Sequence, residues 1–181
     1  GFVRQYNGAG DVVWTRQFGS PLDEFAVSLA YGPAGEVFVV GSTAGSLPGH
    51  KSAGEADAYI VAYNGAGGTM WSRQFGTSGV DDAEAVAFDA AGNPFVAGRT
   101  GGALPGSTSS GGADAFLAAT GPTGDLQWVH QFGGPADDYA NALAIGQAGL
   151  FYVVGATTGA LPGQKHLGHR DAFLVNVSSS S

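Results

Sequence analysis

The sequence predicts an all-β fold built from propeller blades, each of which is a sheet of four short antiparallel strands. Two observations lead to this prediction: a unit of 57 residues recurs along the chain, and each unit contains four short apolar runs separated by turn residues. Glycine, at 32 of 181 residues, is a third observation, because it suits tight turns and disfavours long helices. No stretch shows a sustained helical period.

Three tryptophans mark the repeat most clearly. Each of them opens the run Trp-x-x-Gln-Phe-Gly. Trp14, Trp71 and Trp128 are 57 residues apart (71 − 14 and 128 − 71). Several other residues recur at the same spacing. They are Leu47, Leu104 and Leu161 of a Leu-Pro-Gly triplet, the glycines Gly41, Gly98 and Gly155, and the aspartates Asp57, Asp114 and Asp171. Independent markers that agree on one period indicate a tandem repeat.

The middle unit shows the four expected strands in order. The first, residues 83–88, consists mainly of small apolar residues and ends at a turn. The second, 94–98, is followed by the long loop that carries the Leu-Pro-Gly triplet. The third, 115–119, and the fourth, 126–132, flank a Gly-Pro-Thr-Gly turn. Four short strands in each unit are typical of a propeller blade.

Composition also predicts the order of the strands within a blade. The innermost strand is crowded near the axis, which favours the small residues of the first strand. The tryptophan strand is bulky and is expected at the wide outer edge. The alternative architecture is a β-sandwich assembled from repeated hairpins.

The repeat boundaries predict an incomplete ring. We expect one region over 1–181, divided into a partial blade 1–22, blades 23–76 and 80–133, and a partial blade 137–181. The chain starts and ends within the third strand of a unit, which predicts thirteen strands. About three and a quarter blades are fewer than the four to eight of a closed propeller. We therefore expect a piece of a longer propeller chain, copies that complete the ring by association, or a stack of such arcs; the absence of an initial Met favours the first.

Charge and composition exclude several classes of partner. The net charge is −8, and the seven Lys and Arg residues are scattered, so nucleic acids and anionic membranes are not expected partners. The absence of cysteine excludes disulfides and thiolate sites. No apolar run approaches the roughly 18 residues of a membrane span.

The ordered set of markers resembles a known repeat. Its clearest copy runs through Asp137-Asp138-Tyr139, 151–155, Leu161-Pro162-Gly163 and Asp171-Ala172-Phe173. This copy, with the Trp-x-x-Gln-Phe-Gly run of the other units, resembles the SBBP (seven-bladed β-propeller) repeat family. The second copy departs from the pattern, because no aromatic residue follows its acid pair. The resemblance implies a β-propeller in secreted or surface-exposed proteins, with display, adhesion or assembly roles and no shared catalytic residues.

Acidic residues recur at two places in each unit. Pairs precede the first strand, at Asp23 and Glu24, Asp81 and Asp82, and Asp137 and Asp138. They are expected to gather at one rim of the channel, where carboxylate oxygens suit Ca²⁺. The alternatives are hydrogen bonds that fix turns and a carboxylate pair that cleaves glycosides. Asp57, Asp114 and Asp171 open the third strand and are expected to fix a turn.

Histidines and tryptophans supply the remaining candidate sites. His166 and His169, with Asp171, could ligate a divalent metal, or they could lie in a solvated loop. His50 and His130 are not part of the repeat. The three tryptophans could present flat platforms for sugars, or they could pack between blades.

These observations predict a non-enzymatic binding or structural module of an extracellular or cell-surface protein, with multivalent, adhesive or assembly roles. Its expected partners are proteins or glycans at the cell surface, and flanking repeats or further copies that close the ring. No catalytic residue and no cofactor other than Ca²⁺ is expected. The alternatives are a carbohydrate-binding propeller and a fragment of a propeller hydrolase or lyase.

Overall fold

The structure, a computed structural model, describes residues 1–146 and 149–178. These residues contain thirteen strands and no α-helix. The strands are β1 (Phe2–Tyr6), β2 (Val12–Gln17), β3 (Glu24–Tyr31), β4 (Val37–Thr43), β5 (Asp57–Tyr63), β6 (Thr69–Phe75), β7 (Asp81–Phe88), β8 (Pro94–Thr100), β9 (Asp114–Thr120), β10 (Leu126–Phe132), β11 (Asp138–Ile145), β12 (Leu150–Thr157) and β13 (Asp171–Ser178).

The strands form four antiparallel sheets, in each of which strands that are neighbours in sequence are neighbours in space. The sheets are β1-β2, β3-β4-β5-β6, β7-β8-β9-β10 and β11-β12-β13. Two sheets therefore have the four antiparallel strands expected of a blade. The first sheet corresponds to strands three and four of a unit, and the last to strands one to three.

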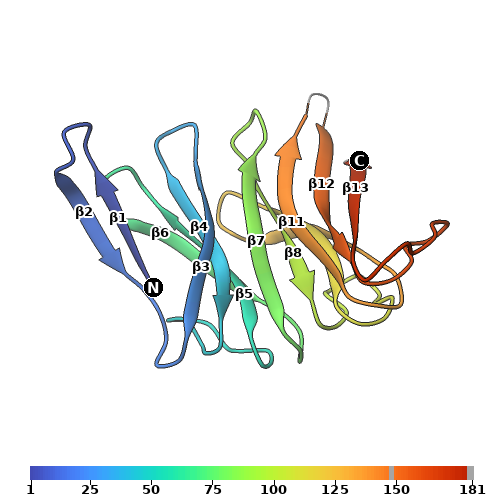
Figure 1. Cartoon of the computed structure of the whole chain (residues 1–181). Helices are drawn as coiled ribbons and strands as arrows, with labels where there is room; N and C mark the ends of the chain where they lie inside the picture. The colour runs from blue at the N-terminus through green and yellow to red at the C-terminus, as the bar shows by residue number, and fades with distance from the viewer. Residues whose placement is uncertain (147–148, 179–181) are drawn as a thin grey trace.

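The four sheets follow one another in a row, from the blue N-terminal hairpin to the red C-terminal sheet (Figure 1). β7 contacts β3, β4 and β5 of the preceding sheet, and β11 likewise contacts β7, β8 and β9. The first strands of successive sheets are thus neighbours, as expected of strands that gather around an axis. A sandwich of two facing sheets does not describe this arrangement.

Apolar side chains fill the space between each sheet and the next. Between the second and third sheets, Phe38, Val40 and Ile60 meet Val86 and Phe116. A similar cluster lies between the third and fourth sheets, and a smaller one joins the first hairpin to the second sheet. Both faces of the internal sheets are therefore covered, which explains why β5 and β9 are buried along their whole length.

Each first strand contains a β-bulge at the same position of the unit. The register shifts between Ala26 and Ser28 in β3, and the same shift recurs in β7 and β11. The recurrent glycine of the second strand lies opposite this bulge. A Cβ at Gly41 would stand 1.8 Å from the Phe25 carbonyl oxygen, and one at Gly98 would stand 1.9 Å from that of Asp82. Only glycine lets the second strand come this close.

The first strands begin earlier than the sequence predicts. β7 starts at Asp81 rather than at residue 83, so the acid pair belongs to the strand and not to the loop before it. The cause is a backbone link between sheets: Asp81 N donates to Ala56 O at 2.8 Å. Asp138 N donates to Ala113 O in the same way, at 2.7 Å. These links fix the chain in extended form before the sheet ladder starts.

Candidate functional site

The recurrent polar residues meet between successive sheets, at three places that we call seams. The first seam contains Gly19 and Glu24. The second contains Asp57, Gln74, Gly76 and Asp81, and the third contains their equivalents. These equivalents are Asp114, Gln131, Gly133 and Asp138.

A glutamine at the end of the fourth strand ties three segments together. In the second seam, Gln74 Oε1 accepts a hydrogen bond from Leu47 N at 2.8 Å. Its Nε2 donates to Gly45 O at 2.8 Å and to Asp57 Oδ2 at 2.7 Å. The side chain is 8 % exposed. The long Leu-Pro-Gly loop is thus held against both the third and the fourth strand.

The third seam repeats this arrangement. Gln131 Oε1 accepts from Leu104 N at 3.0 Å, and its Nε2 donates to Gly102 O at 2.9 Å and to Asp114 Oδ2 at 2.8 Å. Two independent copies of the same three bonds show that the Gln-Phe-Gly run is a structural clamp.

The aspartates that open the third strands each accept a hydrogen bond from the loop that precedes the strand. Asp57 Oδ2 accepts a hydrogen bond from Ala53 N at 2.8 Å, and Asp114 Oδ2 accepts one from Ser110 N at 2.9 Å. Asp171 Oδ2 accepts one from Leu167 N at 2.8 Å. In each case the donor lies four residues before the acid.

Two buried carboxylates face each other in the second seam. A Cβ at Gly76 would stand 2.5 Å from Asp57 Oδ1 and 2.6 Å from Asp81 Oδ2, so both oxygens flank one point. Both aspartates are 0 % exposed. Burial raises the pKa of Asp81, the carboxylate of Asp57 raises it further, and hydrogen bonds from Thr100 and Thr77 oppose the rise.

The third seam has the same pair. A Cβ at Gly133 would stand 2.5 Å from Asp114 Oδ1 and 2.5 Å from Asp138 Oδ2. Both aspartates are again 0 % exposed. Asp138 Oδ2 accepts a hydrogen bond from Gly134 N at 2.7 Å. The seams therefore bring together two acids that lie 24 residues apart in sequence (81 − 57 and 138 − 114).

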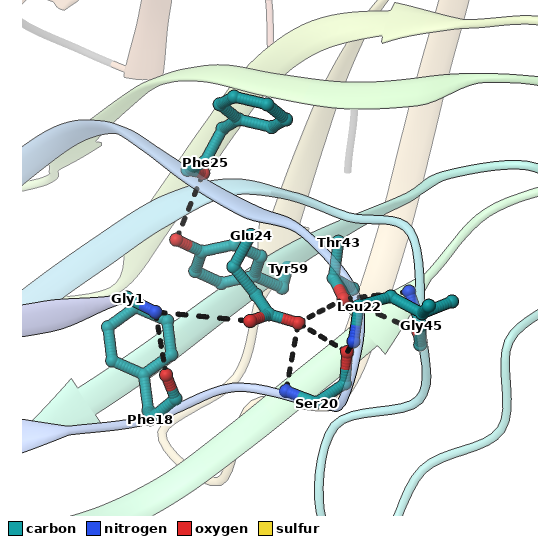
Figure 2. A network of polar contacts seen from close by, with 9 residues as sticks. All are labelled: Gly1, Phe18, Ser20, Leu22, Glu24, Phe25, Thr43, Gly45 and Tyr59. Atoms are coloured by element: carbon teal, nitrogen blue, oxygen red, sulfur yellow. Dashed lines mark hydrogen bonds and ion pairs between the residues drawn. The ribbon is translucent and has the colours of Figure 1, made fainter.

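The first seam has a glutamate where the others have an aspartate (Figure 2). Glu24 Oε1 accepts hydrogen bonds from Ser20 N at 2.8 Å, Ser20 Oγ at 2.5 Å and Thr43 Oγ1 at 3.0 Å. The amino group of Gly1 lies 3.9 Å from Oε2. Burial acts to raise the pKa of Glu24, but these bonds and the nearby positive charge outweigh it, so the pKa lies below its ordinary value.

The six acids expected at one rim have separate locations. Asp23 is exposed, Asp82 forms an ion pair with Arg99, with 2.7 Å between Oδ2 and Nε, and Asp137 Oδ1 accepts from Ala113 N at 2.9 Å. The cause is register: Asp82 corresponds to Phe25, not to Glu24, and a shift of one residue along a strand reverses its face. Within residues 1–146 and 149–178, no three acids or histidines are grouped as metal ligands would be.

The tryptophans lie over the sheet that follows their own. Trp14 is 7 % exposed, and its Nε1 donates to Gly65 O at 3.2 Å. A Cβ at Gly67 would stand 2.5 Å from the Trp14 ring, and one at Gly124 would stand 2.5 Å from the Trp71 ring. These rings therefore cover the hairpin turn of the next sheet. This position favours packing between sheets over a platform for sugars.

The third tryptophan also packs between sheets. The ring centroid of Trp128 lies 5.8 Å from that of Phe95 in its own sheet and 5.7 Å from that of Phe151 in the next. The exposed His130 packs edge-to-face against the same ring, with 5.2 Å between the ring centroids.

The other histidines lie in loops. His166 Nε2 lies 3.7 Å from Asp171 Oδ2, and the exposed His169 does not complete a three-residue metal group with them in the described part of the chain. His50 Nε2 lies 2.9 Å from Ser72 Oγ.

A groove that sequence reasoning missed runs along the last sheet. Its volume is about 980 Å³, and its lining includes Phe132, Leu161, Gln164, Asp171 and Phe173. β13 pairs with β12 on one side, whereas the third strands β5 and β9 also pair with a fourth strand. The number of strands could have predicted this groove. In the described residues the last sheet has no fourth strand, and the groove lies beside β13, where a fourth strand would pair.

The sequence model of the SBBP family, described as a beta-propeller repeat, matches residues 71–105. Over these residues the chain is similar to the SBBP beta-propeller repeat. The match starts at Trp71 and ends in the Leu-Pro-Gly triplet, so it includes Gln74, Gly76 and Asp81 of the second seam and the bulged strand of the third sheet.

Two further proteins are similar to this chain. The regulatory protein FlaEY of Caulobacter vibrioides is 30 % identical over 125 residues, which cover 65 % of this chain and 13 % of FlaEY. The chain thus spans a small part of that relative. A crystal structure of a protein of unknown function from Bacteroides caccae superposes with a TM-score of 0.49 and 12 % identity, over 99 % of this chain and 58 % of that one.

Proposed function

We propose that the chain is a non-enzymatic binding and structural module of an extracellular or cell-surface β-propeller, and that its two end sheets bind further blades. The arc of about three and a quarter blades is incomplete, since closed propellers have roughly four to eight. Neighbouring blades come from flanking repeats or from other copies of the chain. The location outside the cell is the expectation that follows from the resemblance to the SBBP repeat.

The N-terminal end supports this proposal through one comparison. Leu29 of β3 is 65 % exposed, whereas Val86, at the same position of β7, is 8 % exposed. Val86 is covered by the second sheet, which supplies its strands β3, β4 and β5 to this contact. The first sheet consists of β1 and β2. Leu29 therefore lacks the cover that a complete preceding blade would give.

The C-terminal end shows the complementary difference. Leu174 of β13 is 66 % exposed, whereas Leu117 and Ile60, at the same position of β9 and β5, are 0 % exposed. Tyr152 of β12 is 37 % exposed, but its equivalent Phe95 is 6 % exposed. Exposed apolar surface of this kind marks an interaction site.

The internal seams show how two ends would fit together. The ring of Phe38 in the second sheet packs on Phe88 of the third, with 4.8 Å between ring centroids. Their equivalents at the ends are Tyr152 and Tyr31, both of which are aromatic. The groove beside β13 would then accept a fourth strand by edge pairing. A glutamine on that strand would clamp Leu161 as Gln74 clamps Leu47.

The arrangement of the polar residues supports a binding role rather than a reaction. The acids and glutamines that recur in the units hold turns, loops and sheet contacts, as described above. The loops repeat at equal spacing, which suits several weak contacts to one partner. A protein or a glycan at the cell surface is the partner class that we propose.

Light scattering during size-exclusion chromatography tests the end-sheet proposal. We expect the chain to associate as its concentration rises, and we expect Tyr31→Lys and Leu174→Lys each to shift it towards the monomer. Met70→Lys is the control, because Met70 is 48 % exposed but lies on β6 of the second sheet, which is not an end sheet. A monodisperse monomer of the unaltered chain at high concentration would contradict the proposal.

A further inference from the structure

The facing aspartates of the second and third seams have a feature that turn fixing does not explain. Asp57 Oδ1, Asp114 Oδ1 and Asp138 Oδ1 are buried and accept no hydrogen bond from the described residues. All three side chains are 0 % exposed. Each carboxylate is hydrogen-bonded through Oδ2, but a buried oxygen without a partner is unfavourable, so a positive ligand at Oδ1 would stabilise the ionised form.

We propose that the second and third seams each bind one Ca²⁺ ion, between Asp57 and Asp81 and between Asp114 and Asp138. The proposal is independent of how the end sheets are covered, because both seams are internal to the chain.

The free oxygens are held in position by the other oxygen of the same carboxylate. Asp57 Oδ2 accepts hydrogen bonds from Ala53 N and Gln74 Nε2, which leaves Oδ1 on the side of Asp81. Asp114 Oδ2 is held by Ser110 N and Gln131 Nε2 in the same way. The carboxylates are thus oriented before any ion binds, which lowers the entropic cost of binding.

The recurrent glycine lets the two acids approach the backbone, and so each other, closely. Any side chain at Gly76 would begin 2.5 Å from Asp57 Oδ1 and 2.6 Å from Asp81 Oδ2. The same holds at Gly133, at 2.5 Å from each acid. Neither Gly76 nor Gly133 has a positive φ, so the close approach of the carboxylates, rather than a left-handed backbone, accounts for glycine at these positions.

The charge of the site favours a divalent ion. None of the four aspartates forms an ion pair with a basic group among the described residues. Two carboxylates supply hard oxygen ligands and two negative charges, and Ca²⁺ accepts the flexible geometry that such a partial set offers, completed by waters and carbonyl oxygens. Mg²⁺ demands a stricter octahedron and is expected to bind more weakly.

Calorimetric titration of the full chain with CaCl₂, after treatment with EGTA, tests the proposal. We expect uptake of two ions per chain. We also expect the unfolding midpoint to rise by at least about 5 °C at a Ca²⁺ concentration of about one hundred times the dissociation constant. NaCl at matched ionic strength is the control, because general screening would act equally in both salts.

Asn variants separate a bound ion from a shared proton. In Asp57→Asn and Asp114→Asn, the amide can still accept the bonds to Oδ2 and can donate to the facing aspartate, so each variant is expected to fold, as circular dichroism would show. Each should bind one ion instead of two. Asp125→Asn should keep both, because the Asp125 side chain is 65 % exposed and its oxygens contact Arg73 and Thr123 rather than a seam acid.

Two results would overturn the proposal. One is the absence of uptake at millimolar Ca²⁺, which would mean that a shared proton or a water satisfies each pair. The other is unchanged uptake in both Asn variants, which would place the ion elsewhere.

Discussion

A glutamine side chain joins three segments in each internal seam, and its position explains why the run Gln-Phe-Gly recurs. Gln74 bonds the backbone of Leu47 and Gly45 and the carboxylate of Asp57. All of these groups are buried, and the glutamine supplies each of them with a hydrogen bond. The phenylalanine that follows packs on the next sheet, with 5.8 Å between the ring centroids of Phe75 and Phe116.

Removal of this clamp should destabilise the fold. We expect Gln74→Ala to lower the free energy of unfolding by about 3 kcal/mol, because it leaves buried groups without partners. Urea denaturation followed by tryptophan fluorescence measures the loss. The control is Gln127→Ala at an exposed position, which should change the free energy by no more than about 0.5 kcal/mol. Equal effects of the two substitutions would show that the clamp does not matter.

Glu24 gives the first seam a pH dependence of known sign. Its pKa in the folded chain lies below the ordinary value of 4.5, so folding favours the ionised form. The stabilisation is present above the unfolded pKa and is lost as the pH falls through the folded pKa. The difference in unfolding free energy between the unaltered chain and Glu24→Gln should therefore be largest near neutral pH and shrink in acid. A difference that stays constant with pH would contradict this assignment.

The hairpin turn between the third and fourth strands is the element that receives the tryptophan of the preceding sheet. Gly10, Gly67 and Gly124 occupy the same place in three such turns, and all have positive φ, at 89°, 75° and 84°. Gly67 and Gly124 lie against a tryptophan ring, whereas nothing stands within 4 Å of a Cβ at Gly10. A substitution at Gly10 therefore measures backbone strain alone, whereas one at Gly67 or Gly124 measures backbone strain together with packing against the ring.

The turn glycines provide a matched test of tryptophan packing. Gly10→Ala should cost about 1 kcal/mol, which is the strain of a left-handed alanine. Gly67→Ala adds a collision with the Trp14 ring and should cost about 1–3 kcal/mol more. Thermal unfolding of both variants measures the difference. Identical midpoints would mean that the ring moves aside without cost.

Most elements could be predicted from the sequence, because a unit that recurs at fixed spacing repeats its turns and apolar runs. The fourth strand of the third sheet, Leu126–Phe132, was predicted to the residue. The start of β7 was not, because Asp81 is drawn into the strand by a bond to Ala56 of another sheet. The bulge at Glu84 was also missed, since it depends on the register between strands.

At the scale of the molecule, the repeat predicted the order of the four sheets, but it did not predict which residues meet in the seams. Asp81 and Asp82 are adjacent in sequence, and adjacency suggested a pair. Their side chains leave opposite faces of β7, so Asp81 meets Asp57 and Asp82 meets Arg99. Contacts between sheets bring together residues that no local sequence pattern connects. The pairing of the facing acids could therefore not be predicted from the sequence.

Each seam is made from the end of one unit and the start of the next, at offsets that are equal along the chain. The surfaces that meet are therefore similar from one seam to the next. A whole unit can be added or deleted without creating a mismatched junction. Unequal recombination between the copies of the coding sequence would shift the number of blades by integers and preserve every contact that remains. Such a gene could alter the number of blades of its product in one step, whereas an insertion of part of a unit would interrupt the equal spacing that aligns one seam with the next.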